Sequence, residues 1–148
     1  MEEDHVLEKY MITQVKCFFC DNVQTVKDTC DNCGIAFALY SCISCLVWDS
    51  NPKGHFHCDE CNLCRIGGKE NYFHCKKCHI CFANRLKNNH KCIKNCGLGN
   101  CPLCGGRIHD SSMELHVPEC GHLLHDKCYC MLLSNNIHSC IVCNSSFN

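Results

Sequence analysis

The sequence predicts a small, metal-stabilised fold of irregular α+β class with little regular secondary structure. Of its 148 residues, 21 are cysteine and 11 are histidine, far more than an ordinary globular domain contains. No long run of leucine, isoleucine, valine and phenylalanine offers a continuous apolar core, and cysteine pairs spaced C-x2-C recur along the chain. A chain of this composition is expected to fold around cross-links or metal ions.

The cysteines are predicted to bind zinc rather than to form disulfides. Histidines stand at ligand-like positions beside the C-x2-C pairs, which is typical of zinc sites, whereas a disulfide framework has no use for histidine. The N-terminal residues are acidic and polar, without the apolar stretch of a signal peptide, and no segment has the length of a membrane span. We therefore expect an array of zinc modules in the reducing cytoplasm or nucleus, without a membrane partner.

The cysteine and histidine positions divide the chain into three blocks. The first block holds two C-x2-C pairs separated by nine residues, which is the composition of one four-thiolate zinc site. Its candidate ligands are Cys17, Cys20, Cys30 and Cys33.

The middle block contains an internal repeat. Residues 56–64 read F-H-C-x2-C-x-L-C, and residues 73–81 repeat this pattern seventeen positions later, with isoleucine in place of leucine. Partial copies on both sides indicate a short spiral or ladder whose units share metals. Which ligands share an ion stays open, because adjacent residues such as His57 and Cys58 point in opposite directions in an extended chain. Twelve candidate ligands suffice for three tetrahedral sites, and they are Cys42, Cys45, His57, Cys58, Cys61, Cys64, His74, Cys75, Cys78, Cys81, His90 and Cys92.

Regular structure is expected in few places. Short hairpins are predicted at the C-x2-C pairs, and one helix is predicted from about Asp126 to about Ser134, where Asn135 and Asn136 end it. Residues 93–100 contain two glycines and two asparagines, which are typical of turns. We expect this segment to be a linker that leaves the metal modules on either side some freedom.

The last block has the most specific pattern, with eight candidate ligands in the order C-C-C-H-H-C-C-C. They are Cys101, Cys104, Cys120, His122, His125, Cys128, Cys140 and Cys143. This order resembles the RING finger with two histidines, which implies a cross-brace: Cys101, Cys104, His125 and Cys128 would bind one zinc, and the other four the second. All six predicted zinc sites then have four protein ligands, which leaves no open position for hydrolytic water.

The RING resemblance also implies an activity. RING fingers hold a ubiquitin-charged conjugating enzyme and promote ubiquitin transfer to a protein substrate, without a catalytic nucleophile of their own. The conjugating enzyme packs on an apolar groove between the two metal loops and the helix. The residues at those positions are Leu103, Leu132, Leu133 and Val142. Leu132 and Leu133 could equally fill the core, because one face of the helix must be buried.

Taken together, the blocks resemble the RING and CHY zinc-finger ubiquitin ligases. Supporting stretches are H-C-D-E-C-N-L-C-R-I-G at 57–67, Y-F-H-C at 72–75 and C-G-H-L-L-H at 120–125. The resemblance implies a partial CHY-type finger at 1–37, a CTCHY-type finger at 38–95 and a RING finger at 101–144. His5 matches a ligand of the CHY finger whose partner ligands are absent from the sequence, so we expect it to bind no metal.

Two alternatives to a RING-type ubiquitin ligase stay open. The chain could be a non-catalytic adaptor or decoy, since Ile141 and Asn144 stand where many active RING fingers have proline and a basic residue. Nucleic-acid binding is a weaker alternative, because a formal net charge of -1 provides no basic surface. Cys96 and Cys130 are left over and are interpreted as spare thiols. The histidines interpreted as surface or loop residues are His55, His79, His109, His116 and His138.

Overall fold

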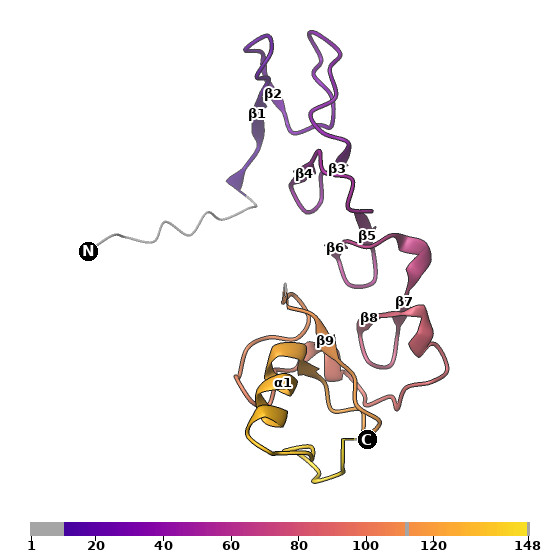
Figure 1. The fold of residues 1–148 in the computed structure, drawn as a ribbon. Helices are drawn as coiled ribbons and strands as arrows, with labels where there is room; N and C mark the ends of the chain where they lie inside the picture. Colours follow the sequence, from indigo (N-terminus) through magenta and orange to yellow (C-terminus); the bar gives the residue numbers. More distant parts are fainter. Residues whose placement is uncertain (1–10, 112, 148) are drawn as a thin grey trace, which may run out of the picture.

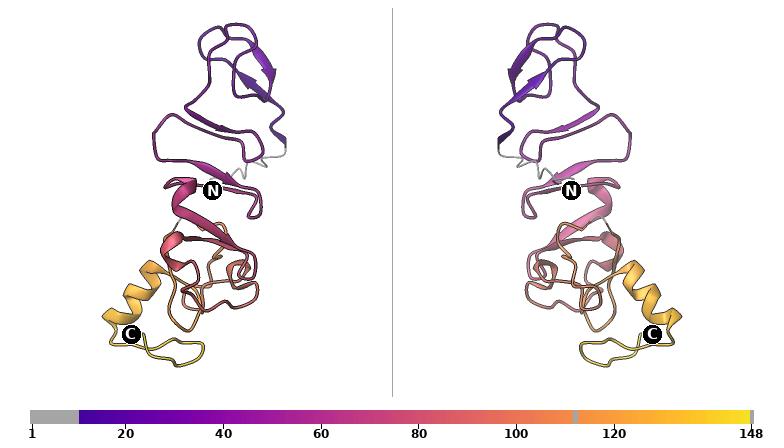
Figure 2. Two further views of the ribbon diagram at one scale, coloured as in Figure 1. Left: turned by 90° about the vertical axis from the view of Figure 1, so that its right-hand side faces the viewer. Right: turned by 90° about the vertical axis from the view of Figure 1, so that its left-hand side faces the viewer.

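The computed structural model describes residues 11–111 and 113–147. The prediction for His5 lies outside these residues. Small units follow one another in an elongated row, and a module with the α-helix lies at the C-terminal end (Figures 1 and 2). Within the described ranges, no helix has both the length and the apolar character that crossing a membrane would require. The irregular α+β array predicted from the sequence is confirmed.

Two-stranded antiparallel hairpins supply most of the regular structure. They pair β1 (Gln14–Lys16) with β2 (Val23–Thr25), β3 (Tyr40–Cys42) with β4 (Val47–Asp49), β5 (Phe56–Cys58) with β6 (Leu63–Arg65), β7 (Tyr72–Cys75) with β8 (Ile80–Ala83), and β9 (Leu115–His116) with β10 (Leu124–His125). The 3₁₀ turns are η2 (Lys69–Asn71), η3 (Asn84–Leu86) and η4 (Cys96–Leu98). The two sequence repeats form equivalent hairpins, in which Phe56 lies opposite Arg65 and Phe73 lies opposite Phe82.

A left-handed residue follows the second cysteine in seven of the nine C-x2-C pairs, where the chain turns back on itself. The seven residues have φ between 52° and 71°, and they are Asp21, Gly34, Leu46, Asn62, His79, Gly105 and Asn144. In five of the turns this residue donates its backbone N–H to the carbonyl of the first cysteine, as Asn144 does to Cys140 at 2.7 Å. Glycine, asparagine and aspartate recur because the left-handed region costs most other residues about 1–2 kcal/mol. Asn144 therefore meets a backbone requirement of the last metal loop.

The single α-helix of the described residues, α1 (Asp126–Ser134), confirms the helix predicted from the sequence. Asp126 occupies the first turn, where a carboxylate interacts favourably with the positive end of the helix dipole. At the other end, the Asn135 N–H bonds to the carbonyls of Met131 and Leu132, and Asn136 has a φ of 58°. The two asparagines end the helix as expected.

One apolar cluster joins the last hairpin of the array to the C-terminal module. From the hairpin it takes Ile80, which is 0% exposed, and Phe82. From the module it takes Ile108, Leu124 and Leu132, all of which are buried. The cysteines of nearby metal clusters complete this core. The sequence predicted no continuous core, and the structure forms this small one by combining short apolar segments that are far apart along the chain.

Residues 93–100 are packed against this junction rather than free. Gly97 is buried in η4 and donates its N–H to the Cys78 carbonyl at 2.8 Å, while Asn95 donates to the Lys77 carbonyl at 2.8 Å. A Cβ atom on Gly97 would lie 2.6 Å from the Ile80 Cβ. The expectation of a flexible linker is therefore wrong. Gly97 of this segment allows the backbones of two modules that pack together to approach closely.

Candidate metal centres

The predicted ligands come together in six groups. In five groups, four ligand atoms lie within 4.8 Å of one another. We number them in chain order: site 1 is Cys17, Cys20, Cys30 and Cys33; site 2 is Cys42, Cys45, His57 and Cys64; site 3 is Cys58, Cys61, His74 and Cys81; site 4 is Cys75, Cys78, His90 and Cys92; site 5 is Cys101, Cys104, His125 and Cys128. One more group is present, and contacts among Cys120, His122, Cys140 and Cys143 define it as site 6.

The separations between these atoms fit tetrahedral zinc. Zn–S bonds of about 2.3 Å and Zn–N bonds of about 2.0–2.1 Å imply S–S separations of about 3.8 Å and S–N separations of about 3.5 Å. The Sγ atoms of Cys17 and Cys33 are 3.8 Å apart, and those of Cys61 and Cys81 are 3.6 Å apart. The His57 Nδ1 atom lies 3.3–3.9 Å from the three sulfurs of site 2. None of the 21 cysteines, all of which lie among the described residues, forms a disulfide. These are structural zinc clusters.

The structure resolves how the middle ligands are shared. His57 belongs to site 2 and the adjacent Cys58 to site 3, while His74 belongs to site 3 and Cys75 to site 4. Each site takes a C-x2-C pair from one unit and its other two ligands from the following segment. Successive units are therefore locked together through metal ions. Strand alternation, which turns neighbouring side chains to opposite faces, makes this possible.

The C-terminal module interleaves its ligands differently. Site 5 combines the first and third ligand pairs of the block, and site 6 brings together the second and fourth. The chain must pass back and forth between the two ions, which is the cross-brace arrangement implied by the RING resemblance. Strands β9 and β10 and helix α1 place the central pairs: His125 ends β10, and Cys128 lies in the first turn of α1.

Backbone N–H groups in the metal loops favour the thiolate form that binds zinc. The N–H of Cys33 hydrogen-bonds to the Cys30 sulfur and, against the effect of burial, helps lower the pKa of Cys30 to about 6. Burial tends to raise the pKa of Cys101, but the N–H groups of Cys104 and His125 outweigh it and the pKa falls to about 6. In the same two sites the pKa values of Cys33 and Cys128 are raised to about 12, so each site holds one thiol that deprotonates easily and one that does not. Zinc binding requires the thiolate form of all of them.

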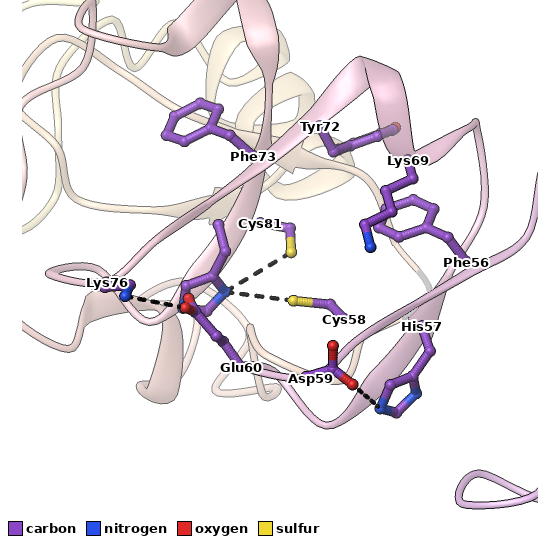
Figure 3. Close-up of a pocket in the computed structure, with 11 residues that line it drawn as sticks. Phe56, His57, Cys58, Asp59, Glu60, Lys69, Tyr72, Phe73, Lys76 and Cys81 are labelled. Carbon is purple, nitrogen blue, oxygen red and sulfur yellow. Dashed lines mark hydrogen bonds and ion pairs between the residues drawn. The ribbon is translucent and has the colours of Figure 1, made fainter.

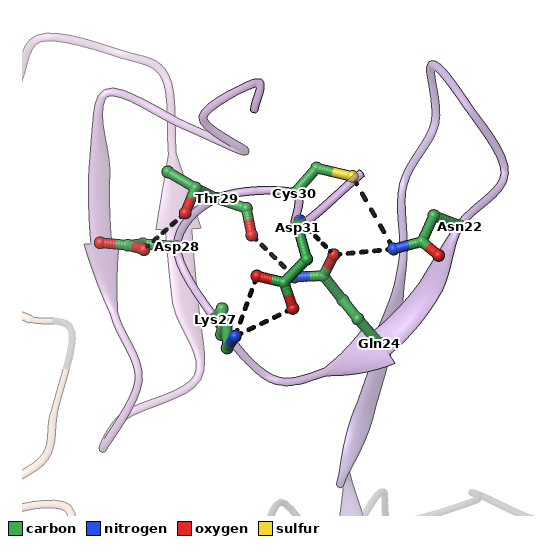
Figure 4. Close-up of polar contacts among 7 residues, drawn as sticks. All are labelled: Asn22, Gln24, Lys27, Asp28, Thr29, Cys30 and Asp31. Carbon is green, nitrogen blue, oxygen red and sulfur yellow. Dashed lines mark hydrogen bonds and ion pairs between the residues drawn. The ribbon is translucent and has the colours of Figure 1, made fainter. Parts of the chain in front are cut away.

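Polar contacts support site 1. The segment around this site contributes no residue to the apolar cluster between the last hairpin of the array and the C-terminal module. Gln24 is 8% exposed and lies at the centre of the contacts in Figure 4. Its Nε2 donates to the Thr29 carbonyl at 2.7 Å, and its Oε1 accepts the Asp31 backbone N–H at 2.8 Å. Asn22 donates to the same Oε1 at 3.1 Å. These bonds hold the segment that carries Cys30 in place against β2.

Partners outside the metal clusters hold the second ring nitrogen of several histidines. His125 donates from Nε2 to the Arg107 carbonyl at 3.1 Å, and His90 donates from Nδ1 to the Leu86 carbonyl at 2.8 Å. In site 3, the His74 Nε2 lies 3.3 Å from the Glu60 carboxylate. Such partners fix the ring orientation and increase its basicity toward the metal.

Glu60 lies in a pocket of about 350 Å³ between the hairpins β5–β6 and β7–β8 (Figure 3). The pocket is lined on one side by aromatic residues, among them Phe56 and Tyr72, and on the other by ligands of site 3. Besides its contact with His74, the Glu60 carboxylate pairs with Lys76 at 3.3 Å, as Figure 3 shows. It therefore belongs to the surroundings of site 3.

We expect Glu60→Gln to weaken zinc binding at site 3 by roughly 10- to 100-fold, the usual effect of losing a carboxylate partner of a zinc-bound histidine. Competition with a colour-forming chelator would show one zinc ion released earlier than in the wild type. Asp59→Asn is the matched control, because Asp59 is 92% exposed and 3.8 Å from the His57 Nε2. Equal release from both variants would contradict the role of Glu60.

Two of the surplus histidines are packed rather than merely exposed. His55 lies 3.3 Å from the Asp49 carboxylate and stacks on Tyr40. His116 stacks on Tyr129 with ring centroids 3.5 Å apart, and burial lowers its pKa. Neither joins one of the five metal groups given in full, in line with the prediction that they are not ligands. His55 lies in a loop, as interpreted, whereas His116 belongs to β9.

The two spare cysteines have different surroundings. Cys96 is half-buried beside Cys78, and burial raises its pKa. Cys130 is exposed on α1. Neither belongs to one of the five groups given in full or to the contacts that define site 6.

The four residues predicted to contact a conjugating enzyme differ in exposure. Leu103 and Val142 are 37% and 53% exposed on the two metal loops, and Leu133 is half-buried. Leu132 is 2% exposed in the core, so its prediction as a docking residue is corrected: it faces the interior because α1 must bury one side. The adjacent Met131 is 58% exposed. Sequence reasoning overlooked Met131, although a helix that buries Leu132 turns its neighbour outward.

Comparison with known proteins identifies relatives along nearly the whole chain. No family model matches the chain. The E3 ubiquitin-protein ligase SRFP1 of Oryza sativa subsp. japonica is 40% identical over 144 residues, which cover 97% of this chain and 55% of the rice protein. The E3 ubiquitin-protein ligase RZFP34 of Arabidopsis thaliana is 36% identical over 143 residues, which cover 96% and 49%. A RING finger protein of Schizosaccharomyces pombe is 36% identical over 143 residues, which cover 95% and 33%.

The chain thus spans about half the length of the two plant relatives. The similarity includes all three blocks, and the structure groups their cysteines and histidines into an interlocked array followed by a cross-brace. On these grounds, the chain is similar along nearly its whole length to proteins of the RING and CHY zinc-finger family.

Proposed function

We propose that the chain acts as a RING-type ubiquitin ligase in the cytoplasm or nucleus, binding a ubiquitin-conjugating enzyme and promoting ubiquitin transfer to a protein substrate. Two relatives carry the name E3 ubiquitin-protein ligase, which supports this class of activity. The metal groups also support a scaffold role, because four protein ligands per zinc leave no position for a reacting water. In this proposal the chain supplies a docking surface and no nucleophile.

The observation that carries the proposal is the exposure of apolar side chains on both metal loops and on α1. Leu103 lies in the first loop, Ile141 and Val142 in the last, and Met131 on the helix, and all four are 37–58% exposed. Other apolar residues of the same module are buried in its core. Exposed apolar residues gathered on one small module are typical of a protein interaction site.

The test is ubiquitination in vitro with a panel of conjugating enzymes, comparing the wild type with Leu103→Ala. We expect the wild type to form ubiquitin chains with at least one enzyme. Truncating a central contact residue should lower the rate by roughly tenfold or more. Leu103 is no metal ligand, so zinc content should stay unchanged and can be measured in the same samples.

Leu39→Ala is the matched control, because Leu39 is 78% exposed and lies outside the C-terminal module. It should transfer ubiquitin at the wild-type rate. Absence of transfer by the zinc-loaded wild type with every enzyme of the panel would contradict the proposal. So would equal rates for Leu103→Ala and the wild type.

A further inference from the structure

The charged residues of the chain are separated along the sequence in a way that the formal net charge of -1 conceals. Residues 71–109 contain seven of the 14 lysines and arginines and none of the 15 aspartates and glutamates. Residues 1–70 contain 11 acidic and six basic residues, and residues 110–148 contain four and one. The hairpin β7–β8 and the segment that follows it are therefore basic, whereas the parts of the chain on either side are acidic.

Six of these cations gather around zinc site 4, and we call them the basic belt. They are Lys76, Lys77, Arg85, Lys87, Lys91 and Lys94. Lys76 and Lys77 lie in the C-x2-C loop that supplies two ligands of the site. Lys91 lies between the other two ligands, His90 and Cys92. Because the four ligand atoms lie within 4.8 Å of one another, these three lysines surround one metal cluster.

Hydrogen bonds hold the other three cations of the basic belt beside the same site. Asn95 donates its N–H to the Lys77 carbonyl at 2.8 Å, which places Lys94 next to Lys77. The His90 Nδ1 atom donates to the Leu86 carbonyl at 2.8 Å, and the residues on either side of Leu86 are the remaining two cations. Site 4 and its contacts therefore hold together the backbone that carries all six.

The basic belt is exposed and has few partners of opposite charge. All six residues are exposed, and within the described ranges only Lys76 forms an ion pair, with the Glu60 carboxylate at 3.3 Å. Site 4 itself, with three thiolates, one imidazole and one divalent ion, offsets only one of the six positive charges. Cations held this close together repel one another, so a partner that supplies negative charge is bound favourably. The pair with Glu60 shows that a carboxylate fits beside the belt.

Two observations favour an acidic protein segment over a nucleic acid as the partner. The aromatic residues of the basic region are half-buried or buried, namely Tyr72, Phe73 and Phe82, so bases find no exposed ring on which to stack. The parts of the chain beside the belt are acidic, and their zinc sites add negative charge because three or four thiolates outweigh one divalent ion. A long polyanion is repelled there, whereas a short acidic segment contacts the belt alone.

We propose that the basic belt is a docking surface for a short protein segment rich in aspartate and glutamate. Carboxylates of the segment pair with the lysines around site 4, and the metal site holds the backbone from which these lysines project. The surface uses none of the apolar residues proposed to contact a conjugating enzyme. The proposal concerns binding alone and does not depend on ubiquitin transfer.

The first experiment measures the binding of a fluorescent oligoglutamate peptide to the full zinc-loaded chain by fluorescence anisotropy. We expect saturable binding that weakens as salt is added, because salt screens exposed charges. The double variant Lys77→Glu and Lys94→Glu should bind the peptide roughly tenfold more weakly, because like charges then face each other. Arg85→Glu with Lys87→Glu changes no residue of the C-x2-C loop and covers the case in which the first variant loses zinc.

The matched control is Lys16→Glu with Lys27→Glu, which makes the same change in charge. Both lysines belong to the first unit, at the opposite end of the row from β7–β8 (Figure 1). Their ion pairs with Asp21 and Asp31 are exposed, and such pairs contribute little to stability. The control should bind the peptide as the wild type does. A zinc-loaded belt variant with wild-type affinity would overturn the proposal, and so would a wild type that does not bind the peptide.

The second experiment locates the peptide on the wild-type protein without any substitution. A carbodiimide joins the peptide carboxylates to lysine amines that they contact, and mass spectrometry identifies the modified lysines. We expect cross-links at Lys77, Lys91 and Lys94. Lys16 and Lys127, which are exposed outside the belt, should react only at background level. Cross-links spread evenly over all these lysines would refute the docking surface. Tighter binding of a labelled oligouridine RNA than of the peptide would also refute it, because the belt would then be a nucleic-acid surface.

Discussion

Removing zinc with excess chelator should unfold the whole chain. Structural zinc sites contribute roughly 10–16 kcal/mol each in small metal-binding domains, and this free energy is also folding free energy. Here the apolar core is confined to the junction around Ile80 and Leu124, and the units between residues 14 and 65 have hairpins of only three-residue strands. Without ions, these units have too little buried apolar surface to stay folded.

Circular dichroism and elemental analysis of the same samples check this prediction. The folded protein should carry about six zinc ions by the count of four ligands per site, and the helical signal of α1 should disappear as the ions are removed. Calcium added in place of zinc is the control and should not restore the fold, because calcium prefers oxygen ligands. A stable, helical, zinc-free chain would contradict the prediction.

Ile80→Ala should destabilise the zinc-loaded protein by about 2–5 kcal/mol, the usual cost of truncating a buried isoleucine. Ile80 is 0% exposed in β8, and it packs in a core to which Leu124 and Leu132 of the C-terminal module also belong. The loss should therefore affect the helix as well as the hairpin. Urea unfolding followed by the helical signal of α1, with zinc present throughout, measures the effect.

Ile66→Ala provides the matched control for this substitution. Ile66 is 56% exposed just after β6, so its truncation should change the unfolding free energy by no more than about 0.5 kcal/mol. If Ile80→Ala left the unfolding of α1 unchanged, the array and the C-terminal module would unfold independently. The shared core would then contribute little to their association.

The local features of the fold follow from short-range signals in the sequence. Asp126, Asn135 and Asn136 mark α1 because capping and the helix dipole act within one turn. C-x2-C pairs predict hairpin tips because two sulfurs can reach one ion only across a tight turn. The same reasoning leaves the sharing of ligands open. Whether His57 joins Cys42 or Cys61 depends on how successive units stack, and no local preference determines that.

The packing of residues 93–100 was harder to predict for a physical reason. Gly97 and Asn95 suit a flexible connection and a tightly packed turn equally well, since both residues tolerate unusual backbone angles. Only the position of Ile80 beneath Gly97 decides between the two, and Ile80 lies on another strand. The exposure of Leu132 was undecided for the same reason. The side of α1 that becomes buried depends on the elements against which it packs.

The metal clusters also change the electrical character of the protein. Apart from Cys96 and Cys130, nineteen of the 21 cysteines belong to the six sites and would bind as thiolates. Nineteen negative sulfurs against six divalent ions leave seven negative charges, which lower the formal net charge of -1 to about -8 in the zinc-loaded chain. A protein that looks nearly neutral from its acidic and basic residues is therefore a polyanion. A net charge of this sign disfavours association with nucleic acids and favours association with basic surfaces.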